Sequence, residues 1–182
     1  NGSISIGKKN VISGADIFNY EIVDGNVRII GLNFENIDYT SKISKFKIYG
    51  GFDEISMDSN WGGYREGKIL ITDAKKIKIP SQIDGKNVTE TCWKSHLNID
   101  ITDGIAIKGI EEIEYPETLK KISNEGTTAF PDIKIVNLND GLEEIGNYAF
   151  WDYGNVKSLK IPSSVMKISG RPFIGMSKDT EV

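Results

Sequence analysis

The 182-residue sequence predicts a mainly β fold, a repeat solenoid in which short strands stack on one another in successive coils. Three features predict this fold. An apolar pattern recurs every 23 residues in the last third of the chain, apolar and polar residues alternate within each copy, and an aromatic residue follows each copy. One copy is too short to bury its own apolar face, so neighbouring copies must stack. We therefore expect an N-terminal β cap over residues 1–72 and four to five coils over residues 73–182.

The repeat is clearest in the segments 113–122, 136–145 and 159–168, which begin 23 residues apart. Each segment opens with apolar residues at alternate positions, as in a strand with one buried face. A Pro or Asn then ends the strand, and a second apolar pair returns along the opposite side of the coil. The pattern predicts parallel strands near Ile77–Ile79, Ile113–Tyr115, Val136–Leu138 and Leu159–Ile161.

Two further segments complete the predicted repeats. Residues 77–83 match the opening of the later copies, and an Asp84-Gly85 turn follows them. Residues 99–105 echo the pattern 22 residues after Ile77, so we interpret them as a truncated fifth repeat. A local hairpin about Asp103-Gly104 is the alternative.

An aromatic residue is expected to fill the middle of each coil. Ala-Phe pairs end at Phe130 and Phe150, Pro-Phe ends at Phe173, and Cys92-Trp93 takes the same place in the upstream copy. We expect the four rings to be buried at equivalent positions: Trp93, Phe130, Phe150 and Phe173. Trp151 and Tyr153 are expected on the outer turn of their coil, partly exposed.

The N-terminal region predicts a hairpin over residues 18–29, where apolar and polar residues alternate on both sides of Asp24-Gly25. Two more strands are predicted at 43–49 and 68–72, but the fold of residues 33–72 as a whole does not follow from the sequence. The hairpin would cover apolar side chains at the open end of the stack.

The segment Leu142-Glu-Glu-Ile-Gly-Asn-Tyr-Ala-Phe150 carries a family resemblance. It resembles the BspA-like class of bacterial leucine-rich repeats, and the similarity extends over about residues 73–174. Tyr153 stands where this family often has Cys, and residues 170–173 depart from its Gly-x-x-Ala-Phe. The resemblance implies a right-handed leucine-rich-repeat superhelix with short helical turns and a hairpin cap. It also implies a non-enzymatic cell-surface or secreted protein that serves adhesion or protein binding.

The charge balance excludes some partners. The 22 basic and 26 acidic residues are interspersed and give a net charge of -4, which argues against a nucleic-acid partner. No run of about 18 apolar residues predicts a transmembrane helix. Residues 1–30 lack the basic and apolar stretches of a signal peptide. We expect a monomer.

Catalytic residues are not expected. Cys92 and His96 are the only residues of their types, and Cys92 aligns with a buried Ala, where a thiol is inert. One Cys and one His are too few for a Cys/His zinc site. The acid pairs 111–112 and 143–144 lie at solvent-facing positions, and neighbouring side chains on a strand point to opposite faces. We therefore expect no cofactor, no metal and no enzyme.

A binding surface is expected on the strand face of the coils. Strand alternation predicts that seven polar residues point outward: Lys78, Glu112, Glu114, Asn137, Asn139, Ser158 and Lys160. Stacking would align them into a polar ladder of mixed sign that holds a protein ligand. A glycan-binding module that uses Trp61 and Tyr64 on a glycine-rich loop is the alternative.

Overall fold

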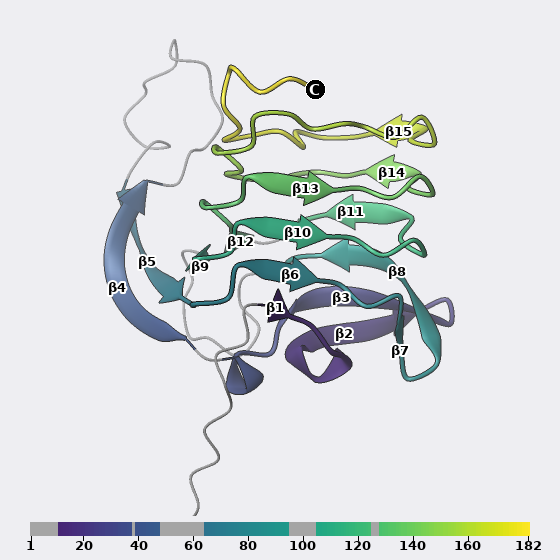
Figure 1. Ribbon diagram of the computed structural model, residues 1–182, viewed down its shortest axis with the longest axis horizontal. Helices are drawn as coiled ribbons and strands as arrows, with labels where there is room; N and C mark the ends of the chain where they lie inside the picture. The colour runs from purple at the N-terminus through teal and green to yellow at the C-terminus, as the bar shows by residue number, and fades with distance from the viewer. Residues whose placement is uncertain (1–10, 38, 48–63, 95–104, 125–127) are drawn as a thin grey trace, which may run out of the picture.

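The computed structural model describes residues 11–37, 39–47, 64–94, 105–124 and 128–182. In these residues the chain forms three sheets and two short 3-10 helices, Ala15–Ile17 (η1) and Phe34–Asn36 (η2), with no α-helix. The coils stack from the N-terminal strands at one end to the C-terminus at the other (Figure 1). The predicted mainly β, parallel repeat fold is confirmed, while its handedness stays a prediction.

Sheet A contains the predicted strand face. Its order is β1-β6-β10-β13, all parallel, with the bounds Val11–Ile12, Lys76–Lys78, Glu112–Glu114 and Ile135–Asn137. The register pairs Ile113 with Val136, which confirms the 23-residue period for these coils, whereas Ile77 pairs with Ile113, 36 residues further on. The strand predicted at Leu159–Ile161 is wrong. At this position the coil makes an isolated parallel bridge from Ser158 to Glu181.

Sheet B forms the second side of the stack, in the order β15-β14-β11-β8-β3-β2. The bounds are Phe18–Val23 (β2), Asn26–Leu32 (β3), Lys86–Cys92 (β8), Lys121–Ser123 (β11), Glu144–Ile145 (β14) and Lys167–Ile168 (β15). A short strand, β7 (Gln82–Ile83), pairs antiparallel with β8. From β3 to β15 the strands are parallel, and an inward column runs through Ile29, Thr91, Ile122, Ile145 and Ile168.

Sheet C forms the third side, in the order β12-β9-β5-β4. The bounds are Thr40–Lys47 (β4), Tyr64–Ile71 (β5), Ile105–Lys108 (β9) and Thr128–Ala129 (β12). β4 and β5 are antiparallel, which confirms the two strands predicted at 43–49 and 68–72. The parallel pairing of β5 with β9 attaches them to the stack. Because their partners are distant in sequence, the sequence alone did not reveal this arrangement.

The N-terminal region contributes strands to all three sheets of the stack. β1 pairs with β6, β3 with β8, and β5 with β9, so the ladders of all three sheets cross from residues 1–72 into residues 73–182. The domain boundary itself stays a prediction. The truncated fifth repeat at 99–105 lies mostly outside the described residues. Since β10 pairs directly with β6, no strand of that segment separates them, and Ile105 begins β9 of sheet C.

Two Asp-Gly turns make the hairpins. Asp24 and Gly25 have φ of 49° and 78°, and Asp84 and Gly85 have φ of 50° and 71°. Positive φ at both central residues defines the type I′ turn, whose twist fits flanking strands. The predicted hairpin of residues 18–29 is therefore confirmed as β2 and β3. Its capping role remains a prediction. The alternative turn at Asp103-Gly104 lies outside the described residues.

The aromatic plugs lie where the coils meet. Trp93, Phe130 and Phe150 are fully buried as predicted, and Trp93 packs edge-on against Phe130 with ring centroids 5.2 Å apart. Phe173 stacks on Phe150 at 5.8 Å but is only partly buried, so that prediction is wrong. Phe173 belongs to the last described coil, and no further described coil covers the outer side of its ring.

One position next to the plugs differs from expectation. Tyr153 is buried, not on an outer turn, and its ring contacts both Phe130 and Phe150. The positive φ of Asp152, 60°, accompanies this inward turn of the chain. Trp151 is partly exposed as predicted.

Cys92 does not take the place of the repeat alanine. Its register partner is Ser123 in β11, whereas Ala129 pairs with Ala106 in β9. The sequence alignment of Cys92-Trp93 with Ala-Phe is therefore wrong for the backbone. Trp93 still reaches the plug because its large ring extends to Phe130.

Candidate binding face

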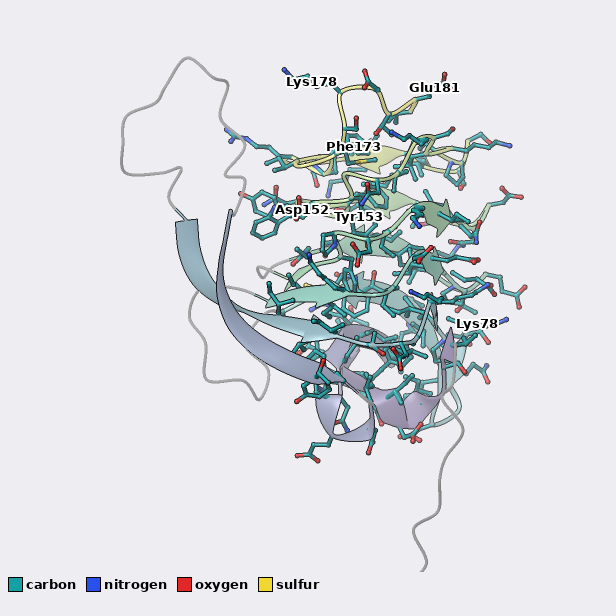
Figure 2. The ribbon with its side chains drawn as sticks, turned by 60° about the vertical axis from the view of Figure 1, so that its left-hand side comes forward. Lys78, Asp152, Tyr153, Phe173, Lys178 and Glu181 are labelled. Carbon is teal, nitrogen blue, oxygen red and sulfur yellow. The ribbon has the colours of Figure 1, made fainter. Side chains whose placement is uncertain are left out.

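The outer face of sheet A carries an ion-paired cluster of four residues from two adjacent coils. Lys76 on β6 forms ion pairs with both Glu112 (2.9 Å) and Glu114 on β10, and Lys78 pairs with Glu114 at 2.9 Å. The register sets these pairs, because Lys76 lies opposite Glu112 and Lys78 opposite Glu114. Figure 2 shows Lys78 pointing away from the stack.

The ion pairs shift the pKa values of Glu114 and Lys76. Lys76 and Lys78 lower the pKa of the Glu114 carboxyl, and Glu114 and Glu112 raise the pKa of the Lys76 ammonium. Both effects favour the charged forms, so the face keeps its alternating charges around neutral pH. Exposed pairs of this kind contribute little stability, but they hold four flexible side chains in a defined arrangement.

The next coil continues the face with different chemistry. Asn137 on β13 lies opposite Glu114 and donates through Nδ2 to the Glu112 carboxylate at 2.8 Å. Ile135 lies opposite Glu112 and is 51% exposed. Ile135 and Lys76 were not among the residues expected on this face. The strand alternation that turns Ile77 and Val136 inward turns Lys76 and Ile135 outward, so the alternation could have predicted both.

Asn139 does not belong to the outward ladder. Its Nδ2 donates to the backbone carbonyls of Glu117 (3.1 Å) and Leu119 (3.0 Å) in the preceding coil. Asn139 follows the end of β13, so the alternation of the strand no longer governs it. Its amide links adjacent coils, and the predicted outward position is wrong. Ser158 and Lys160 are exposed as predicted, although neither lies in a strand.

The aromatic pair of the alternative glycan site can be followed only in part. Trp61 lies outside the described residues. Tyr64 begins β5 of sheet C, opposite Lys47 of β4. Sheet C is a different side of the stack from sheet A, so this pair and the strand face are separate candidates.

The described residues among the catalytic candidates are buried or form ion pairs. Cys92 is fully buried, as expected, and His96 lies outside the described residues. The neighbouring acids turn to different partners, Glu111 to Lys75 (3.3 Å) and Lys134 (2.7 Å), and Glu112 to Lys76.

The described residues contain neither a metal-binding cluster nor a membrane-spanning helix. Within the described ranges, no group of three or more His, Cys, Asp or Glu residues could hold a metal ion. No helix in that part of the chain has the length and apolar character to cross a membrane.

Comparison with known proteins agrees with the repeat. A family model described as "BspA type Leucine rich repeat region (6 copies)" matches residues 106–182. This match begins later than the segment 73–174 that carries the sequence resemblance, and it runs to Val182. No curated protein matches the chain.

One solved structure is similar, the crystal structure of T. pallidum Leucine Rich Repeat protein. It is 17% identical, with a TM-score of 0.49, over 86% of this chain and 53% of that one. The chain thus spans about half the length of that protein, and the fold assignment depends on the strand register described above. Residues 106–182 are therefore similar to the BspA-type leucine-rich repeat family.

Proposed function

We propose that the chain is a non-catalytic, cell-surface or secreted binding module that holds a protein partner with the outer face of sheet A. Leucine-rich repeats of this kind suggest protein–protein interaction modules. The adhesion role, the surface location and the choice of face are our inferences. Of the seven polar residues expected on this face, Asn139 makes the coil contacts instead.

The observation that carries the proposal is the exposed Ile135 beside the ion-paired cluster. Ile135 is 51% exposed, and its strand neighbour across the ladder is Glu112, which Lys76 and Asn137 hold in place. An exposed apolar group beside polar, preorganised side chains is common in protein-binding patches, and here it lies on β13, the edge strand of sheet A. A polyanion would need a cationic face, whereas here the lysines are paired with acids.

The test uses an array of purified cell-surface proteins beside a glycan array, both probed with the folded chain. Ile135→Asp should weaken binding to the captured protein by roughly 30-fold, the effect of losing a central apolar contact. Ile22→Asp is the matched control, because Ile22 is 49% exposed on β2 of sheet B. Circular dichroism would verify that both variants remain folded.

The opposing result is also specific. Binding confined to the glycan array, unchanged by Ile135→Asp and lost on Trp61→Ala or Tyr64→Ala, would replace the strand face with the glycan site. Glu112→Gln with Glu114→Gln gives a milder second variant, since full charge reversal would gather cations around Lys76 and Lys78. These rim changes should affect the association rate and its salt dependence more than the affinity.

A further inference from the structure

Three buried polar groups meet in the interior of the stack. Trp93, Tyr115 and Tyr153 are only 1%, 4% and 1% exposed. Nevertheless, the Trp93 Nε1 and the two tyrosine hydroxyls have no hydrogen-bond partner among the described residues. Buried polar groups are nearly always hydrogen-bonded, because each one left unpaired has lost its bonds to water without a replacement. Three such groups in one place therefore indicate a polar ligand inside the stack.

The three side chains come from three successive coils. Trp93 directly follows β8 of sheet B, and Tyr115 directly follows β10 of sheet A, where its N–H donates to the Asn137 carbonyl at 3.2 Å. Tyr153 follows the residue of positive φ, Asp152, in the next coil. Figure 2 shows Tyr153 within the stack. The strand ends of two sheets and one turn thus bring the three groups to the same interior region.

Aromatic packing holds these groups in place. The Phe130 ring lies between the other two rings, with its centroid 5.2 Å from that of Trp93 and 6.3 Å from that of Tyr153. Tyr153 also packs edge-on against Phe150 at 5.8 Å. A tyrosine hydroxyl lies on the long axis of its ring, so a ring flip does not move it. The polar ends therefore cannot reach solvent without disrupting the plugs.

The polar ends are also close enough to influence one another. Burial raises the pKa of the Tyr115 hydroxyl, and the neighbouring Tyr153 hydroxyl and Trp93 N–H lower it in part. Burial and the Tyr115 hydroxyl raise the pKa of Tyr153. Both tyrosines therefore stay protonated around neutral pH, and each hydroxyl can donate one hydrogen bond and accept others. The Trp93 N–H can only donate, so it needs an acceptor.

We infer that the interior of the stack binds one water molecule where Trp93, Tyr115 and Tyr153 meet. The water oxygen accepts from the Trp93 N–H and from one tyrosine hydroxyl, and the water donates to the oxygen of the other tyrosine. Buried waters typically make about three hydrogen bonds of this kind. An ion would need a compensating charge, and an apolar ligand would leave all three groups unpaired. This site goes beyond the proposed function, which uses the outer face of sheet A.

The first test counts buried waters by magnetic relaxation dispersion of the water oxygen nucleus, which exchange of hydroxyl protons does not affect. The whole chain is compared with the double variant Tyr115→Phe/Tyr153→Phe, which removes both hydroxyls at nearly constant volume. We expect the dispersion amplitude to fall by the equivalent of one water per chain, because the Trp93 N–H alone does not hold a water. Tyr148→Phe is the matched control and should leave the amplitude unchanged, since Tyr148 is only half-buried and packs on Trp151.

Two further measurements support the assignment. Tyr115→Phe and Tyr153→Phe should each lower the melting temperature by about 3 °C, because each removes one bond to the water. The double variant should lose less than the sum, since both residues share the same ligand. A high-resolution crystal structure of the unaltered chain needs no variant. It should show one ordered water within about 3.2 Å of the Trp93 Nε1 and of both hydroxyls.

Three outcomes would overturn the inference. An equal dispersion amplitude for the parent and the double variant would show that the cluster holds no long-lived water. An equal fall for Tyr148→Phe would mean that the lost water lies elsewhere. A crystal structure in which the Tyr115 and Tyr153 hydroxyls bond directly to each other, with no water at the Trp93 Nε1, would replace the water with a direct contact.

Discussion

At the N-terminal end of the stack, the inward column of sheet B finishes on Ile29, which is fully buried; at the C-terminal end the same column finishes on Ile168, which is 53% exposed. The difference comes from what lies beyond each residue. Beyond β3 the chain folds back as β2, which pairs with β3. Beyond β15 no described strand pairs with the sheet. β2 and β15 are thus the two edge strands of sheet B in the described residues, and the inward column stops one strand before the edge at the β2 end but on the edge strand itself at the β15 end.

The largest expected effect compares a plug inside the stack with the plug at its open end. Phe150→Ala should lower the free energy of unfolding by about 3–5 kcal/mol, because it leaves a cavity among fully buried rings. Phe173→Ala should cost about 1–2 kcal/mol, since Phe173 is only partly buried. Urea unfolding of both variants measures the difference. Equal losses would mean that the end coil is as well packed as the interior.

The sequence predicted the interior of this stack better than its ends. The alternation around Ile113, Ile122, Val136 and Ile145 fixed their inward positions, because each is repeated at 23 residues and must pack against its copies. Leu159 has that spacing too, yet residues 159–161 form no strand and the neighbouring Ser158 makes only an isolated bridge, although the same coil contributes β15 to sheet B. The apolar pattern specifies which side chains are buried. A strand also needs neighbouring strands to pair with, and the end coil has fewer of them.

The missed features depend on contacts between segments far apart in the chain. β9 and β12 of sheet C are four and two residues long, too short for alternation to be recognised. Tyr153 is buried because Phe130 of the previous coil lies against it, which no local pattern records. For the candidate face, the sequence identified Lys78, Glu112, Glu114 and Asn137. Their pairing with Lys76 required the register.

A second prediction concerns Asp152, which lies where the end coil docks on the interior. Its N–H donates to the Ile174 carbonyl at 2.9 Å, and burial raises the pKa of its carboxyl from 3.8 to about 6. The folded state therefore binds the proton more tightly than the unfolded state. The free energy of unfolding should fall as the pH rises from about 4 to about 6 and then level off.

Asp152→Asn should remove this dependence and raise stability at pH 7.5 by about 1–3 kcal/mol, since one pKa unit corresponds to about 1.4 kcal/mol. Asn also tolerates the positive φ of this position. Urea unfolding at pH 4.5 and 7.5 gives the comparison, with Asp179→Asn as an exposed control on the last coil. A parent chain whose stability does not change between these pH values would contradict the prediction.

A third, smaller effect is expected at Thr91, near the N-terminal end. Thr91 is the one polar residue of the isoleucine column and is fully buried, and its Oγ1 has no hydrogen-bond partner among the described residues. Thr91→Val should therefore stabilise the chain by about 1 kcal/mol, because it removes a buried unsatisfied hydroxyl at nearly constant volume.

Thr118→Val provides the matched contrast. The Thr118 hydroxyl lies 3.0 Å from the Ser81 carbonyl and 2.8 Å from that of Val88, so its loss should destabilise the chain. Thermal unfolding of both variants distinguishes the cases. A melting temperature that falls for Thr91→Val would mean that its hydroxyl is hydrogen-bonded in solution.

The smallest expected effect compares an inner and an end member of a row of alternating charges that crosses sheet B, formed by Glu21, Arg28, Glu90, Lys121, Glu144 and Lys167. Lys121 lies between two acids, with Glu90 at 3.5 Å and Glu144 at 3.8 Å, whereas Lys167 has Glu144 alone at 3.1 Å. The Lys167 side chain is also more exposed, at 64% against 36% for Lys121. Exposed ion pairs each contribute about 0–1 kcal/mol. Lys121→Ala should therefore cost about 0.5 kcal/mol and Lys167→Ala less.

Since salt screens exposed charges, the difference should disappear at about 1 M NaCl, where the Debye length falls to about 3 Å. Chemical unfolding by urea, which adds no ions, measures it at both salt concentrations. A larger loss for Lys167→Ala at low salt would show that the end of the row is already paired in solution, and the contrast between the two ends would then not extend to the charges.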